Sequence, residues 1–232
     1  MDSSVVNSHQ RQNADTRPAP AAFYFNSSAH LLRIGREQAT NLGELLEALR
    51  VCPEESIFQH TFRTLQEHHF IREGFSNDFA HWAYSQCNEP GLAERLASLD
   101  VRRFTSLSSL RDRIVEIVED YLKDNPASRD RKAVEPFYFC ASEAVVIPTS
   151  LVAHDLSQFI EGLKQASIHS IYHHFIEARL RLKLISYDFS LWIDRELGFK
   201  NAAMRLNGID IYTSTLDGVR NQIIRILQNA NN

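Results

Sequence analysis

AFYFNSSAH (Ala22–His30) and PFYFCASEA (Pro136–Ala144) contain the same aromatic triplet, FYF, at two distant places in the chain. When residues 23–60 are aligned with residues 137–174 without a gap, eleven positions are identical. Many of the remaining positions are apolar in both segments. The repetition therefore extends well beyond the triplet and indicates an internal duplication.

The similarity continues after two short deletions in the second half. SNDFAHW (Ser76–Trp82) aligns with SYDFSLW (Ser186–Trp192), and LSSLRDRIVEIV (Leu107–Val118) aligns with LDGVRNQIIRIL (Leu216–Leu227). The charged segment between the copies contains two prolines and no apolar stripe, which is typical of a linker. We therefore predict a disordered polar tail (1–22), a first helical repeat unit (23–122), a linker (123–136) and a second helical repeat unit (137–232).

The predicted fold class is all-α, with two homologous tandem bundles of about five helices each. Apolar residues recur at helical spacing in both copies, most clearly over 107–121 and 216–227. Asn41 with Glu44 and Asp155 with Gln158 have the spacing of capping boxes. The aromatic triplets are expected to be short extended segments that anchor in the cores.

Composition excludes several classes of function. The net charge of −4 is not that of a nucleic-acid-binding domain. No apolar run approaches the ~18 residues that span a bilayer, and the N-terminus does not resemble a signal peptide. Three widely spaced cysteines argue against a disulfide framework, so we expect small buried thiols in a cytoplasmic protein.

His60 and His174 are the most informative polar pair, because they occupy equivalent positions in the two copies. On the helix that begins near Ser56, His60 lies roughly 130° from the centre of the apolar stripe. One interpretation is a site residue that acts as a general base or a ligand. The other is a structural histidine that hydrogen-bonds a neighbouring helix or loop, and this interpretation is favoured.

Asp78 and Asp188 are the second pair of candidates. Both precede Phe and Trp in a shared D-F-x-x-W pattern at an expected helix start. Aspartate at that position accepts backbone N–H bonds and complements the helix dipole, which explains it without a catalytic role. The alternative is a site that uses His60 and His174 with Asp78 or Asp188 nearby.

Trp82, Trp192, Arg95 and Arg205 are candidates for ligand binding, because each also recurs between the copies. The tryptophans lie three residues after a phenylalanine and are more typical of a core than of a ligand cage. The arginines are explained by salt bridges, with anion binding as the alternative.

No cofactor or metal site is predicted. The sequence contains no glycine-rich phosphate loop, no nucleophile elbow, no H-E-x-x-H and no C-x-x-C. His68 and His69 fall in a region that the second copy lacks, and Leu191 replaces His81 there. A duplicated metal site is therefore not expected, although one site using both His60 and His174 is left open.

The strings SIFQHTF, NDFAHWA and LAERLASLD, with SIYHHFIEARL and DFSLW in the second copy, resemble an uncharacterised bacterial family whose members often carry tandem helical units. The second copy departs from this pattern with Tyr187 for Asn77 and Met204 for Glu94. The resemblance implies a soluble helical protein and no particular activity.

Two functions follow as hypotheses. The first is a binding or scaffolding protein that holds another protein or a small ligand. The alternative is a His/Asp-based enzyme or a metal-binding protein with a site at or near the interface of the two units. The sequence predicts neither an oligomeric state nor the identity of a partner.

Overall fold

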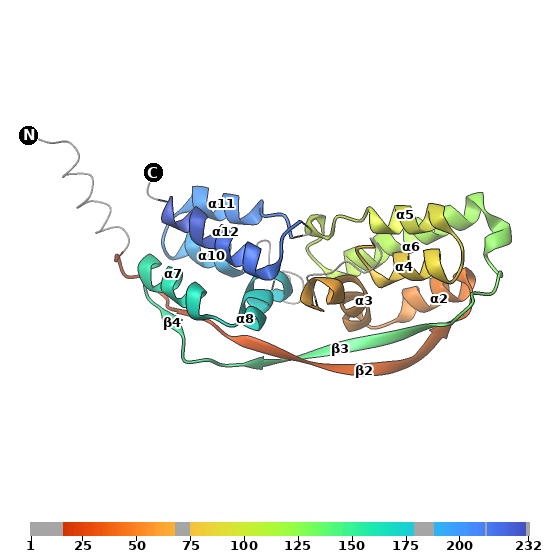
Figure 1. The fold of residues 1–232 in the computed structure, drawn as a ribbon, viewed down its shortest axis with the longest axis horizontal. Coiled ribbons are helices and arrows are strands. Elements are labelled where there is room, and N and C mark those ends of the chain that lie inside the picture. The colour runs from red at the N-terminus through yellow and green to blue at the C-terminus, as the bar shows by residue number, and fades with distance from the viewer. Residues whose placement is uncertain (1–15, 68–74, 179–187, 212, 231–232) are drawn as a thin grey trace, which may run out of the picture. The chain divides into compact units, whose positions relative to one another are not determined.

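The computed structural model describes residues 16–67, 75–178, 188–211 and 213–230 (Figure 1). His68 and His69 lie outside these residues. The helices of the first half are α2 (Leu42–Val51), α3 (Glu54–Glu67), α4 (Asp78–Ser85), α5 (Pro90–Ala97) and α6 (Leu107–Asp124). Those of the second half are α7 (Leu156–Gln165), α8 (Ile168–Tyr172), a π-helical turn (His173–Glu177), α10 (Asp188–Arg195), α11 (Lys200–Asn207) and α12 (Leu216–Gln228).

The chain forms two compact units that do not follow one another along the sequence. The continuous unit comprises residues 30–145. The split unit comprises the described residues of 1–29 and 146–232, so that both ends of the chain contribute to it. The chain therefore passes from one unit to the other twice, near residues 29 and 145.

Each aromatic triplet packs with helices from the other half of the sequence. In the split unit, the Phe23 ring lies 5.1 Å from that of Phe159 and 5.7 Å from that of Trp192. In the continuous unit, the Phe137 ring lies 5.3 Å from that of Phe79 and 5.7 Å from that of Trp82. The four phenylalanines of the two triplets are at most 6% exposed, whereas the tyrosine of each triplet is more than half exposed. The phenylalanines of the triplets are thus buried anchors, as expected, but each triplet packs in a core formed by helices that do not follow it directly in the sequence.

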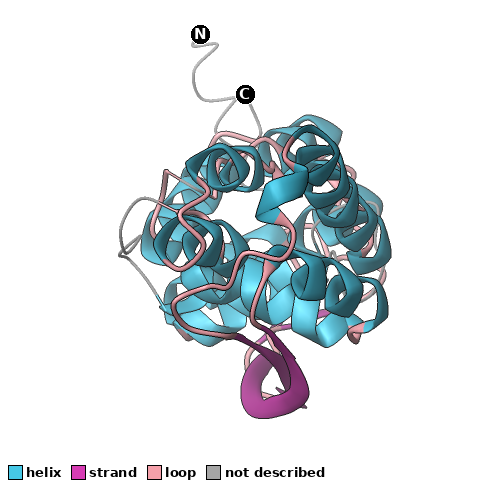
Figure 2. Ribbon diagram, turned by 90° about the vertical axis from the view of Figure 1, so that its right-hand side faces the viewer, coloured by secondary structure: helices cyan, strands magenta, loops and turns pink. Residues whose placement is uncertain are grey.

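The structure is mostly helical, but the all-α class was too narrow, because the described residues also form two small two-stranded sheets. β1 (Phe23–Tyr24) pairs antiparallel with β4 (Val152–Ala153), placing Phe23 opposite Ala153. β2 (Ser27–Ala39) pairs with β3 (Phe137–Ile147) in a second two-stranded sheet. Figure 1 shows β2 and β3 running along the outside of α2 and α3, and the end-on view of Figure 2 shows a strand ribbon outside the helices. Most side chains of β2 are exposed, so its sequence lacks the apolar–polar alternation that identifies a half-buried strand.

Local capping fixes where α2 and α7 begin. The Asn41 carboxamide accepts a bond from the Glu44 N–H, and the Glu44 carboxylate accepts one from the Thr40 N–H. In α7, Asp155 accepts from the Gln158 N–H, and the Gln158 side chain accepts from the His154 N–H. Both predicted N-caps are therefore present, and each return bond goes to the N–H of the residue before the cap rather than to that of the cap itself.

An arginine closes the other end of each of these helices. Arg111 donates to the carbonyl of Cys52, which ends α2, at 2.7 Å. Arg220 donates to the carbonyl of Ala166, which ends α7, at 2.9 Å. These carbonyls lack helical partners, so a guanidinium satisfies them and complements the negative end of the dipole.

The spatial units differ from the predicted ranges at both the linker and the tail. The predicted linker, residues 123–136, packs on the continuous unit: Ala133 donates to the Thr40 carbonyl, and Arg131 pairs with the buried carboxylate of Glu89. Within the predicted tail, residues 1–15 lie outside the described residues, and Ala19 donates to the His154 carbonyl. Backbone pairing, which composition does not reveal, orders the described part of this segment.

Two of the cysteines are buried and the third is partly exposed. Burial raises the pKa of Cys52 to about 11 and that of Cys87 to about 12, so both are protonated and inert near neutral pH. Cys140 has an intermediate exposure, so it departs from the expected burial. Among the described residues, no helix combines the length and the apolarity that crossing a membrane requires.

Candidate functional site

Each candidate histidine lies beside one of the candidate aspartates. His60 Nδ1 of α3 lies 2.9 Å from Asp78 Oδ2 of α4, and His174 Nδ1 of the π-helical turn lies 2.6 Å from Asp188 Oδ2 of α10. A carboxylate accepts only, so the geometry assigns the ring proton to Nδ1 in both pairs. Each Nε2 then carries a lone pair, which is the arrangement of an oriented histidine base.

Asp78 lies in the first turn of α4, but it does not cap the helix. Asn77 is the residue that caps α4, because its carboxamide accepts a bond from the Ala80 N–H at 2.9 Å. Asp78 follows the cap, and its carboxylate reaches His60 instead.

His60 is satisfied on both sides of its ring. Its Nε2 accepts a bond from the Cys140 N–H of β3 at 2.9 Å, and the residue is 6% exposed. Although His60 lies away from the main apolar stripe of α3, it is buried on a second face of this helix by Phe79 of α4 and Phe137 of β3. His60 therefore fits the structural interpretation: it joins a helix to the aromatic strand.

His174 differs from His60 in the hydrogen bonding of its Nε2 atom. The residue is 2% exposed, and its Nε2 is buried without a hydrogen-bond partner. Asn26 occupies the position equivalent to Cys140, but its N–H donates to the Tyr24 carbonyl. Burial lowers the pKa of His174, while the hydrogen bond that its Nδ1–H donates to Asp188 opposes that shift. The imidazole is therefore neutral near pH 7 and offers an unused acceptor.

A cavity of about 330 Å³ lies beside this imidazole. Its polar lining includes His174, Asp188 and Asn26, and its aromatic lining includes Tyr24 and Trp192. Arg195 and Glu196 supply opposite charges to the same wall. Glu196 accepts a bond from the Ala21 N–H, whereas Arg195 has no ion pair within the described ranges. In the aligned sequence, the continuous unit has Ser85 and Gln86 at these two positions, so the charges are specific to the split unit.

A second polar cluster in the split unit was missed by the sequence analysis. The Glu177 carboxylate is 1% exposed and accepts bonds from the Ser28 hydroxyl at 2.7 Å and from His173 Nδ1 at 3.1 Å. The π-helical turn carries both His173 and Glu177, and turns of this kind recur at functional sites. The signal in the sequence was a glutamate in the otherwise apolar stretch FIEA.

The predicted ligand-binding residues are not gathered at one site. Trp82 Nε1 donates to the Glu135 carbonyl and Trp192 Nε1 to the Ala21 carbonyl, which anchors the segment preceding each triplet. Arg95 lies over the Tyr121 ring at 5.4 Å and pairs with Asp124. Arg205 is exposed on α11. Of these four, only Trp192 lines the His174 cavity.

Within the described part of the chain, no group of three or more His, Cys, Asp or Glu side chains is arranged to hold a metal ion. His60 and His174 belong to different units, and each is paired with an aspartate of its own unit. The chemistry available at His174 is therefore that of a neutral, carboxylate-oriented imidazole in a part-apolar cavity.

A family model of unknown function, DUF5752, matches residues 20–228. The chain belongs to this family. A solved structure, "The structure of OrfY from Thermoproteus tenax", is similar with a TM-score of 0.81 and 27% sequence identity, over 92% of this chain and 97% of that one. Because OrfY is archaeal, the bacterial part of the predicted resemblance is not supported. No curated protein matches the chain.

Proposed function

We propose that this DUF5752 protein is a small-ligand-binding protein built by internal duplication, with its ligand site in the cavity beside His174. The observation that carries the proposal is the Nε2 lone pair of His174, which is buried, unpartnered and next to a cavity of about 330 Å³. A buried acceptor without a donor costs free energy, and a ligand hydroxyl or N–H would remove that cost.

Several paired features support the duplication. Equivalent tryptophans anchor the backbone two residues before each triplet, and equivalent arginines close α2 and α7. The order of helices is also the same in the two halves. In this proposal, His60 keeps the structural hydrogen bond to β3, whereas His174 lacks the equivalent bond and can bind a ligand instead.

The cavity supports a ligand with a polar donor and an apolar body. Trp192 and Tyr24 offer flat apolar surface, whereas His174 accepts a hydrogen bond at the buried end. Arg195 and Glu196 provide both signs of charge for a polar substituent. Such a mix of apolar walls and few directed polar groups is typical of small-molecule sites.

An enzyme is the second candidate, and the 2.6 Å bond between Asp188 and His174 favours it. An oriented imidazole with a free Nε2 is suited to remove a proton from a substrate or from water. Among the described lining residues there is no serine, threonine or cysteine, so this alternative does not include a covalent nucleophile from those residues.

A metabolite screen on the full chain tests the proposal. Compounds that raise the melting temperature are titrated against the wild type, His174→Asn and His60→Asn. Asparagine keeps a donor for the aspartate and removes the Nε2 acceptor, so we expect His174→Asn to weaken binding about tenfold, or about 1.4 kcal/mol. His60→Asn should leave affinity unchanged. A ligand whose affinity survives His174→Asn would contradict the proposal, and chemical conversion of a bound compound would favour the enzyme.

Stability should fall with decreasing pH because of the same histidine. The pKa of His174 is lowered in the folded state, so below about 6.5 the unfolded chain binds more protons than the folded chain. The contribution of neutral His174 to the free energy of unfolding is thus fully present above pH 6.5. It is lost as the pH falls from 6.5 toward the lower pKa of His174 in the folded state. Urea titrations from pH 8 to 5 should show a steeper loss for the wild type than for His174→Asn. Equal slopes would contradict this role of His174.

A further inference from the structure

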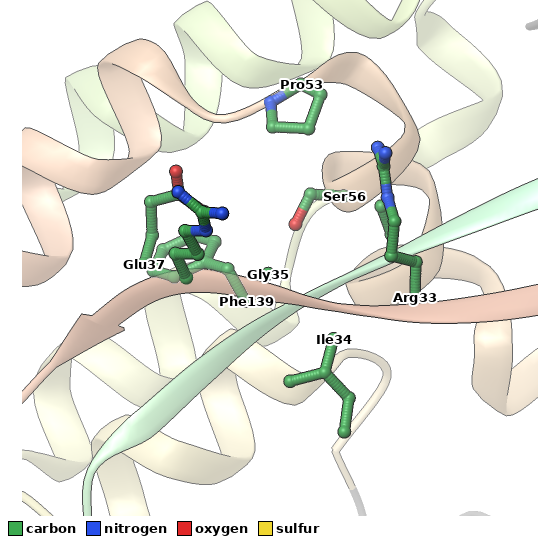
Figure 3. A pocket seen from close by; sticks show the side chains of 9 residues that line it. Arg33, Ile34, Gly35, Glu37, Pro53, Ser56 and Phe139 are labelled. Atoms are coloured by element: carbon green, nitrogen blue, oxygen red, sulfur yellow. The ribbon is translucent and has the colours of Figure 1, made fainter.

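A second cavity, of about 360 Å³, lies in the continuous unit between β2 and the start of α3. Arg33, Arg36 and Glu37 of β2 line one side, and Pro53 and Ser56 line the other. Figure 3 shows the Ser56 hydroxyl directed toward β2 near Gly35, with Arg33 to one side and the Ile34 side chain on the far side of the strand. The histidine–aspartate pairs do not contribute to its lining.

Ser56 supplies an unused donor to this cavity. The residue is 1% exposed, and its Oγ is buried without a hydrogen-bond partner. Serine hydroxyls of helices often bond backward to a carbonyl, as Thr61 does to Ile57 in the same helix. Ser56 has no such bond, so its hydroxyl is available to a ligand.

Two guanidiniums supply the charge. Arg33 and Arg36 are exposed, and neither forms an ion pair with any described residue. Gly35 lies between them, where a Cβ would come within 2.5 Å of the Phe139 carbonyl oxygen. A side chain at this position would therefore force β2 away from β3 and move both arginines.

Acidic groups limit where an anion could lie. Glu37 lines the same cavity, and Glu54 and Glu55 occupy the first turn of α3. These carboxylates repel an anion at the N-terminus of α3, so the helix dipole does not contribute to its binding. The two arginines and the serine hydroxyl must therefore provide the binding energy. Glu54 is held by the Ser108 hydroxyl at 2.9 Å.

We propose that this cavity binds the phosphate group of a small phosphorylated molecule. Two guanidinium forks and one hydroxyl donate from separate directions, which matches a group with three terminal oxygens better than a carboxylate with two. A volume of about 360 Å³ also leaves room for the organic part of the molecule.

The split unit provides a matched control. Ser170 aligns with Ser56 and is likewise buried with an unpartnered hydroxyl. The positions that align with Arg33 and Arg36 are Ile147 and Ser150, so that unit lacks the two charges. Removal of the Ser170 hydroxyl should not affect phosphate binding.

Isothermal titration calorimetry of the full chain with inorganic phosphate and with glycerol 2-phosphate tests the proposed phosphate site. We expect glycerol 2-phosphate to bind with a Kd of about 1 mM or tighter, and more tightly than inorganic phosphate. The double variant Arg33→Gln with Arg36→Gln, and separately Ser56→Ala, should weaken binding about tenfold, whereas Ser170→Ala should not. Circular dichroism and melting confirm that each variant is folded.

Three results would overturn the proposal. The first is that neither probe binds the folded wild type at about 10 mM, ten times the expected Kd. The second is equal affinity in all variants, and the third is tighter binding of acetate than of either phosphate probe. None of these results bears on the His174 cavity, so the proposed function is tested separately.

Discussion

Replacing Phe25 by alanine should lower the free energy of unfolding by about 3–5 kcal/mol, and the loss should fall on the helices of residues 156–228. Phe25 is fully buried, and its ring lies 5.2 Å from that of Phe159 in α7. The helices that follow Phe25 in the sequence belong to the other unit. A large-to-small change at Phe25 therefore leaves a cavity in the split unit, although residues 42–124 are closer to it in the chain.

The two tryptophans report the two units separately. Trp82 lies in the continuous unit and Trp192 in the split unit, so Trp82→Phe and Trp192→Phe backgrounds each leave one reporter. In urea, Phe25→Ala should shift the Trp192 transition more than the Trp82 transition. Phe139→Ala, at the equivalent position of the other triplet, should do the reverse. The opposite assignment would show that the triplets pack within their own repeats.

Gly162→Ala should destabilise the protein even though alanine is the better helix former. A Cβ at Gly162 of α7 would lie 2.4 Å from a ring carbon of Phe25. The ring is enclosed by Phe23 and Phe159, so it has little room to move. Overpacking costs about 1–3 kcal/mol and the gain in helix propensity is about 1 kcal/mol, so we expect a net loss of up to about 2 kcal/mol.

Gly91→Ala in α5 is the matched control for this substitution. There the nearest atom to a new Cβ is a Tyr121 ring carbon at 3.4 Å, an ordinary contact. Urea denaturation should show Gly91→Ala to be neutral or stabilising by up to about 1 kcal/mol. A Gly162→Ala protein as stable as Gly91→Ala would mean that Phe25 does not pack against α7.

Local signals predicted much of the secondary structure. The capping residues Asn41 and Asp155 were identified from spacing, because a side chain three residues from its partner N–H is a purely local interaction. The burial of the aromatic triplets followed from their apolar side chains. The capping boxes and the anchors therefore needed no information beyond each segment.

Long-range features could not be predicted in the same way. The two triplets are identical, so by composition each fits either core equally well. No local signal therefore indicates that Phe23 packs against Phe159 of α7 rather than against α2. β2 was missed because a largely exposed strand carries no alternation. The unpartnered Nε2 of His174 depends on a single backbone N–H, that of Asn26, which bonds to the Tyr24 carbonyl instead of to the imidazole.

A double-mutant cycle between Phe25→Leu and Gly162→Ala tests most directly whether the N-terminal triplet completes the split unit. Leucine removes the ring edge that a Cβ at residue 162 would strike and keeps the core apolar. We predict that Gly162→Ala destabilises the wild type but is neutral or stabilising in the Phe25→Leu background, with a coupling energy of about 1–3 kcal/mol. The same cost in both backgrounds, within about 0.5 kcal/mol, would contradict the packing of the N-terminal triplet against α7 of the split unit.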